Sequence, residues 1–337
     1  MKLMRSAPRW GRPAALEMDS RACVRVAGAR LLAPTNSTRV PETPAPIRNT
    51  MAAMADSDVE IRAATLGDVP AIRSLLAALG DDGPATTVDI VGPYLGHLID
   101  HATALVSERA GDILAFGAGV DTGVSRHLAD LFVRPELLGQ GIGRPLLAAV
   151  FEDAWPRTTF ASADPRALPL YVRAGMTPLW PCLYLEGSAD GLPAPDPAIT
   201  IAAAAPDSLS ELERAWTGAH RPTDHAFWAS QANAEPFAVF ESGQPVALGY
   251  ARARQASPAR VIDRMIIRPG SDPIAPVLAA IRLGAGGSAI VVCLFGPHPA
   301  LPVLLQARFR IIDRDQFMAS DVALVDPIRL LPNPGML

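Results

Sequence analysis

Three glycines alternate in the stretch Gly139-Gln140-Gly141-Ile142-Gly143, between a short apolar run and an amphipathic one. The run from Asp130 to Val133 is rich in strand formers and ends at Pro135, which cannot donate to a sheet ladder. Apolar residues then recur at helical spacing from Leu146 to Trp155. A loop with little Cβ bulk can turn its N–H groups toward one point, and the following helix adds unpaired N–H groups and a positive dipole end. This spacing predicts a backbone site for a phosphate or pyrophosphate.

Other phosphate-binding loops fit these residues less well. A Walker A loop needs a lysine beside its last glycine, and Lys2 is the only lysine of the chain. A dinucleotide fingerprint needs a third glycine where Arg144 or Leu146 stands. A plain tight turn before a helix is the remaining alternative, but three alternating glycines cost more backbone entropy than such a turn requires.

Tyr171 lies in a second motif downstream, where Asp164-Pro165 begins a predicted helix and Gly175 closes it. A phenol can serve as a general acid, although a tyrosine packed on an amphipathic helix is the plain alternative. Asp130 is the candidate base. The plain alternative is that Asp130 is only a solvated carboxylate at the end of a strand. His127 is a weaker candidate base, because a regular strand would turn it to the face opposite Asp130.

Together these motifs resemble the GNAT N-acetyltransferase superfamily, over residues 58–186. The resemblance implies that acetyl-CoA binds here without a metal, that Tyr171 protonates the leaving thiolate, and that Val133 N–H polarises the thioester carbonyl. Asp164 stands where the family usually has an asparagine, and it is also expected to serve as the helix N-cap. Leu138 replaces the Arg or Gln that usually begins the loop. The residues implied to bind the cofactor are Phe132, Val133, Gly139, Gln140, Gly141, Ile142, Gly143, Arg144 and Asp164.

The order of predicted elements divides the chain. Residues 1–54 are rich in proline and arginine and lack periodicity, which predicts a disordered tail or an over-called start. Residues 55–187 form the first predicted domain, residues 188–197 a linker, and residues 198–332 a second domain. Some expectations are local: a helix from Val88 to Ile99 interrupted at Gly92-Pro93, a pair of strands from Met176 to Leu185, and surface positions for Asp81, Asp82, Asp89, His97 and His101.

Two short motifs repeat at offsets of 133 and 134 residues. Ala167-Leu168-Pro169 returns as Ala300-Leu301-Pro302, and Val133-Arg134-Pro135 returns as Ile267-Arg268-Pro269. The expected fold class is therefore α/β (α+β), with two tandem GNAT-like domains, each a mixed, mostly antiparallel sheet flanked by helices. The second copy has Leu304 in place of Tyr171 and no alternating glycines after Pro269, so it is expected to share the fold without transferring acetyl groups. Gly284, Gly286 and Gly287 indicate a helix–strand turn.

Composition limits the partners. The formal net charge is −4, and because residues 1–53 are basic, the remainder is more acidic still, which disfavours nucleic acid. Three scattered cysteines favour a reducing cytoplasm and disfavour a disulfide scaffold or zinc site. No apolar run is long enough for a membrane helix.

The sequence thus predicts a cytoplasmic, bacterial monomer or homodimer that acetylates the primary amine of a small molecule by direct attack in a ternary complex. The alternatives are a non-catalytic acyl-CoA-binding sensor or scaffold, and an acyltransferase with another acyl group or a peptide or aminoacyl acceptor.

Overall fold

The computed structural model describes residues 58–79, 91–253, 259–283 and 289–337. The predictions for residues 1–54, for Asp81, Asp82 and Asp89, and for the glycines of 284–287 lie outside these residues.

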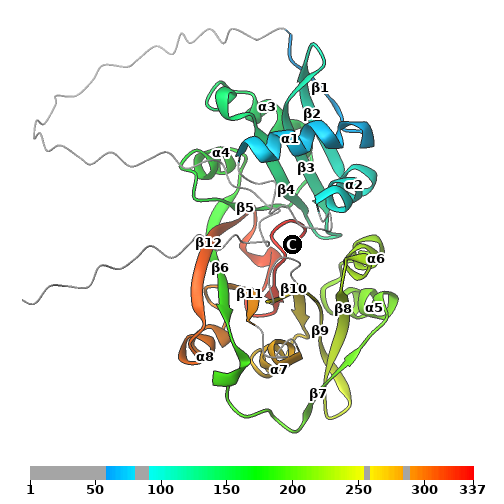
Figure 1. Cartoon of the computed structure of the whole chain (residues 1–337), viewed down its shortest axis with the longest axis vertical. Coiled ribbons are helices and arrows are strands. Elements are labelled where there is room, and N and C mark those ends of the chain that lie inside the picture. The colour runs from blue at the N-terminus through cyan, green and yellow to red at the C-terminus, as the bar shows by residue number, and fades with distance from the viewer. Residues whose placement is uncertain (1–57, 80–90, 254–258, 284–288) are drawn as a thin grey trace, which may run out of the picture.

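The strands of the two halves follow the same order along the chain. The first half contributes β1 (Glu60–Ala63), β2 (Thr103–Arg109), β3 (Asp112–Asp121), β4 (Arg126–Val133), β5 (Arg157–Ala161) and β6 (Thr177–Gly187). The second half contributes β7 (Ile199–Ala203), β8 (Ala234–Glu241), β9 (Gln244–Ala253), β10 (Arg260–Ile267), β11 (Ile290–Phe295), β12 (Arg310–Ala319) and β13 (Leu330–Leu331). Within the described ranges, all of them join one 13-stranded sheet in the order β1-β2-β3-β4-β5-β12-β6-β11-β10-β9-β8-β7, with β13 paired to β10 (Figure 1).

Helices cover both faces of the sheet in the first half. α1 (Val69–Leu79) and α2 (Val91–His101) pack their apolar sides with Phe116 and Phe132 on one face. α3 (Gly143–Phe151) and α4 (Ala167–Arg173) pack with Leu128 and Leu131 on the other face. α5 (Pro206–Thr217), α6 (Pro222–Ser230), α7 (Ala275–Leu283) and α8 (Ala300–Gln306) repeat this order in the second half. The predicted fold class is confirmed.

The two copies match in detail. β10 repeats β4 with an offset of 134 residues at both ends, and α8 repeats α4 with an offset of 133. Both β4 and β10 carry an irregularity at the same position, Ala129 in the first copy and Asp263 in the second. Gly175 follows α4 with φ +86°, and Arg308 takes the matching left-handed conformation after α8 with φ +66°. The second copy therefore kept the backbone even where it lost the glycine.

The halves exchange strands at the centre of the sheet. β12 lies between β5 and β6 and pairs with both, while β6 also pairs with β11. The expected pair of strands from Met176 to Leu185 is wrong, because β6 is one continuous strand. Its partners come from the second half, and local patterns carry no information about a partner so distant in sequence.

Two further local predictions are corrected. Gly92-Pro93 does not interrupt the described part of the helix, because α2 is continuous from Val91 to His101. His97 is buried on α2 and lies 2.8 Å from Asp224 of α6, so it is an interface residue of the two halves and not a surface one.

Candidate active site

The glycine loop leads directly into α3. Gly139 and Gly141 have φ values of +80° and +91°, and a Cβ on either would meet nothing within 4 Å. Only glycine adopts this left-handed backbone freely, and the open space leaves the loop accessible to a ligand. Gln140 ties the loop together, because its side-chain amide donates to the Glu136 carbonyl at 2.8 Å. α3 starts at Gly143, so its first-turn N–H groups meet the same open region.

β4 and β5 diverge next to this loop. They pair in parallel from Arg126 to Leu128 of β4, and the pairing ends at the bulge at Ala129. Beyond the bulge, Arg134 N–H donates to the Leu114 carbonyl of β3 at 2.9 Å. Because successive N–H groups of a strand point to opposite sides, Val133 N–H points away from β3, into the gap beside β5. We call this gap, between residues 129–133 of β4 and the end of β5, the β4–β5 slot.

Tyr171 approaches the slot from α4. Its side chain is 2% exposed and packs in the cluster of Leu131, Leu146 and Met318, the last of which comes from β12 of the second half. Burial, with added contributions from Asp130, Asp164 and Asp315, raises the pKa of Tyr171 well above its usual value. The hydroxyl therefore keeps its proton across the ordinary pH range.

Asp130 and His127 share a face of β4, contrary to the sequence prediction. Their partners on β3 are Ala118 and Val120, which are two residues apart and so point to the same side. The bulge at Ala129 inserts the extra residue that cancels the expected alternation. This face, shared with α1 and α2, is opposite to the one on which α3 and α4 lie. Asp130 is completely buried there.

His127 is engaged through both ring nitrogens. Nε2 lies 3.0 Å from the Pro334 carbonyl, and Nδ1 lies 3.0 Å from the Thr158 hydroxyl. A carbonyl can only accept, so Nε2 carries the proton and Nδ1 accepts from Thr158. Burial lowers the pKa of His127 to about 4, against an opposing effect of the Pro334 bond. With Nδ1 already accepting, this imidazole is a poor proton acceptor for substrate.

Asp164 does not serve as the N-cap of α4. The N-cap position falls on Arg166, and Asp164 accepts from Arg166 N–H at 2.7 Å and from its guanidinium at 2.6 Å. Burial opposes ionisation of Asp164, but the hydrogen bonds from Arg166 outweigh it and hold the pKa of the carboxyl below its usual value. The aspartate therefore forms a turn before the helix, and its direct contact with a cofactor stays a prediction.

The matching slot of the second half is filled by the chain itself. β10 diverges from β11 after Ile262, and β13 enters there by pairing with Met265 and Ile266. Ile267 N–H, the counterpart of Val133 N–H, donates to the Arg329 carbonyl at 2.8 Å. The Arg329 guanidinium also donates to the carbonyls of Arg268 and Ser271, in the turn that replaces the glycine loop. Backbone and side chain of one segment thus occupy both parts of the second site.

A described cavity of about 230 Å³ is lined mostly by the second half, with Thr122 and Val124 of the first half at its edge. It lies between α5, β10 and the connection from β12 to β13, with Trp216, Ile266 and Leu330 among its walls. Glu213 and Arg264 form a buried ion pair beside it, at 2.8 Å. This cavity is separate from the glycine loop and from Tyr171.

The described residues contain no cluster of His, Cys, Asp or Glu suited to a metal ion, and no helix long and apolar enough to cross a membrane.

Residues 90–187 match the family model described as the acetyltransferase (GNAT) domain. The first half of the chain contains a GNAT domain. This membership supports acyl transfer from an acyl-CoA as the class of reaction. A search of curated proteins found no match.

Several solved structures share the fold of most of this chain. One is a putative acetyltransferase from Pyrococcus horikoshii, with 13% identity and a TM-score of 0.62 over 83% of this chain and 94% of that one. Another is a tandem GNAT protein from the clavulanic acid biosynthesis pathway, with 16% identity and a TM-score of 0.55 over 80% of this chain and 100% of that one. A third is a GCN5-related N-acetyltransferase from Sphaerobacter thermophilus, with 18% identity and a TM-score of 0.51 over 81% of this chain and 96% of that one. At these identities the likeness concerns the fold.

The GNAT domain brings most of the predicted residues to one place. Phe132 and Val133 border the β4–β5 slot, the glycine loop leads from them into α3, and Tyr171 packs in one cluster with Leu131 of β4, where Asp130 acts on it electrostatically. Sequence reasoning missed the residues that the second half brings close, namely Asp315, Met318 and Pro334. No motif marks them, because their proximity results from the strand exchange and from the path of residues 329–337.

Proposed function

We propose that the chain is an acetyl-CoA-dependent N-acetyltransferase that acts on the primary amine of a small molecule. One observation carries the proposal: the β4–β5 slot of the first half is free of any described strand, whereas β13 fills its counterpart. The open slot lies between a left-handed glycine loop and a buried tyrosine, and acyl transfer from a CoA thioester needs a phosphate cradle, a carbonyl-polarising donor and an acid in this order.

The chain's residues then take separate roles. Backbone amides from Gly139 to Arg144 hold the pyrophosphate, and the edge of Phe132 and Val133 pairs with the pantetheine arm as an added strand. Val133 N–H donates to the thioester carbonyl, where negative charge develops. Acetyl-CoA supplies the activated acyl group.

Asp130 and Tyr171 manage the two protons of the reaction. The amine must lose a proton as its N–C bond forms, and Asp130 accepts it, directly or through water. The C–S bond breaks as the tetrahedral centre collapses, and the Tyr171 hydroxyl protonates the departing thiolate. No covalent acyl-enzyme is needed, and the buried Cys182 and Cys293 lie in the aromatic core of the sheet.

A library of primary amines, assayed by release of free CoA thiol, tests this proposal. We expect turnover with at least one amine, and a loss of about 10²–10⁴ in kcat for Tyr171→Phe with little change in acetyl-CoA affinity. Tyr250→Phe is the matched control, because Tyr250 is equally buried in the second half, and it should keep near-normal turnover.

Two results would contradict the proposal. Tight binding of acetyl-CoA without turnover on any amine would favour the sensor or scaffold alternative. Full activity of Tyr171→Phe up to alkaline pH would remove the tyrosine from the role of acid.

A further inference from the structure

Residues 333–337 form a compact turn that contacts both halves; we call it the 333–337 turn. Asn333 organises it, because its side chain accepts from Gly335 N–H at 2.9 Å and its carbonyl accepts from Met336 N–H at 3.1 Å. The turn follows β13, so the strand that fills the second slot also fixes where the turn begins. Figure 1 places this end of the chain at the centre of the molecule, between the lobes.

Two arginines of the second half donate hydrogen bonds to the turn. Arg221 donates to the carbonyls of Met336 at 2.5 Å and Leu337 at 3.2 Å, and Arg264 donates to the Leu337 carbonyl at 2.6 Å. Both arginines are almost completely buried and are balanced by Asp224 and Glu213. Charged donors in a buried interface make strong hydrogen bonds, so the turn has one defined position.

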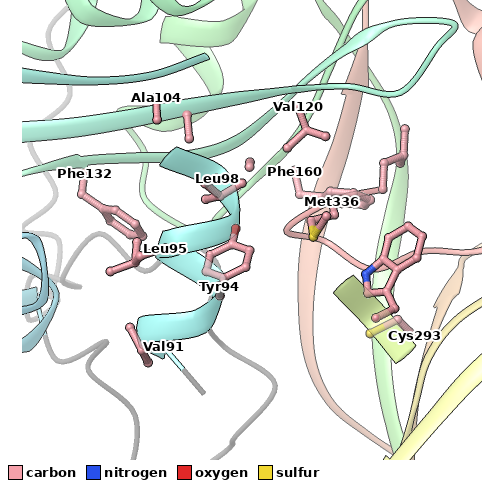
Figure 2. Packing of buried hydrophobic residues seen from close by; sticks show 14 of the residues in the cluster. Val91, Tyr94, Leu95, Leu98, Ala104, Val120, Phe132, Phe160, Cys293 and Met336 are labelled. Carbon is pink, nitrogen blue, oxygen red and sulfur yellow. The ribbon is translucent and has the colours of Figure 1, made fainter. Parts of the chain in front are cut away.

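The first half receives the other side of the turn. The Pro334 carbonyl accepts from His127 at 3.0 Å, and the Gly335 carbonyl lies 3.5 Å from the Tyr94 hydroxyl of α2. Met336 is 1% exposed and joins the buried cluster of Tyr94, Leu98 and Phe160, as seen in Figure 2. The turn therefore covers β4 at His127, on the face that also carries Asp130, three residues along the strand.

We propose that the 333–337 turn is a wall of the acceptor site and restricts the acceptor to compact amines. The inference rests on the proposed function, in which Tyr171 and the glycine loop serve the cofactor from the α3–α4 face. An amine must then reach the slot from the opposite face, where Asp130 lies. The turn closes that face at its His127 end, so an extended peptide cannot lie across β4 and β5.

Acetylation of alaninamide and of the tripeptide amide Ala-Ala-Ala tests the wall, because both present the same amine on bodies of different length. In the wild type, kcat/KM should be at least about tenfold higher for alaninamide. Deleting residues 334–337 should bring the two values within about threefold of each other, with acetyl-CoA affinity measured by calorimetry unchanged. His127→Ala, which removes one contact with the turn, should shift the ratio in the same direction and serves if the deletion fails to fold.

His298→Ala is the control for loss of a buried histidine, because His298 is 1% exposed in the second half and outside the turn. It should leave the ratio of the two amines unchanged. If the wild type acetylates the tripeptide amide and alaninamide with equal kcat/KM, the turn is not a wall of the acceptor site, although acetyl transfer itself is supported.

Hydrolysis of acetyl-CoA gives a readout without any amine. Opening the wall admits water to the thioester, so the deletion and His127→Ala should release acetate and CoA thiol several-fold faster than the wild type. If acetyl-CoA binds but no amine is acetylated, the proposed function fails, and unchanged hydrolysis in both variants would then overturn the wall as well.

Discussion

Three carboxylates act on the hydroxyl of Tyr171, and one of them, Asp315, belongs to the second half of the chain. Their negative charge adds to burial and keeps the phenol protonated. An acid must hold its proton until the leaving group needs it, so this environment suits the proposed role, although a raised pKa also weakens the driving force of the transfer.

His127 should make stability depend on pH. Burial lowers its pKa to about 4 in the folded protein, below the ordinary value of 6.5. Folding therefore favours the neutral ring, and the stabilisation is complete above pH 6.5 and lost as the pH falls toward 4. The shift corresponds to at most about 3 kcal/mol. Urea unfolding of His127→Gln between pH 4 and 7 should show a shallower pH dependence than the wild type.

The charge of Arg221 and the Pro334 carbonyl both face His127, so the control must keep them in place. His298→Gln is suitable, because His298 also has its pKa lowered to about 4 by burial but lies elsewhere. It should remove its own share of the pH dependence and leave that of His127. An identical pH profile in the wild type and His127→Gln would contradict the assignment.

At the scale of elements, two glycine variants distinguish cofactor binding by the glycine loop from the stability cost of a strained turn. Gly141→Ala places a Cβ at φ +91°, which costs about 1–2 kcal/mol of stability. Gly270→Ala is a matched control, because Gly270 follows β10 with φ +85° and a Cβ there would also meet nothing within 4 Å. Both variants should lose similar stability, but only Gly141→Ala should weaken acetyl-CoA binding, by about tenfold or more.

Calorimetry of the two glycine variants checks this prediction, and urea unfolding checks the matched cost. Equal acetyl-CoA affinity in both would mean that the loop is not the phosphate cradle. The same titration should give one acetyl-CoA per chain, because β13 and Arg329 fill the second site.

The loop and the strand β6 differ in how far sequence could predict them. The glycine loop depends on neighbours within a few residues, so alternating glycines before an amphipathic run were sufficient. β6 was predicted as a pair of strands, but it is one strand that contains Pro178 and Pro181. β11 and β12 pair along its two edges, and this long-range pairing keeps it continuous.

The whole molecule should unfold as one unit, although it consists of two copies of one fold. Phe317 of β12 packs its ring 5.1 Å from Phe160 of the first half and 5.1 Å from Phe295 of the second. His97 of the first half also pairs with Asp224 of the second across the buried interface. Neither half keeps a complete sheet without the other.

Phe317→Ala should lower the free energy of unfolding by about 3–5 kcal/mol and reduce hydrogen-exchange protection equally in β4 and β10. Circular dichroism and exchange in urea would measure this loss. Val172→Ala, at a position 49% exposed, should change neither. Two separate transitions, or a loss of protection confined to one half, would contradict the coupling of the halves.

The amino-acid sequence by itself determined the repeated elements, the fold class, the glycine loop and the tyrosine helix, because each depends on residues close together in the chain. Tertiary structure alone decided that His127 shares a face with Asp130, that β12 lies beside β5, and that Arg329 satisfies Ile267 N–H. These features depend on a one-residue bulge and on pairing between segments far apart in sequence. Local propensity is the same for every possible partner, so only burial of the complete sheet selects among them.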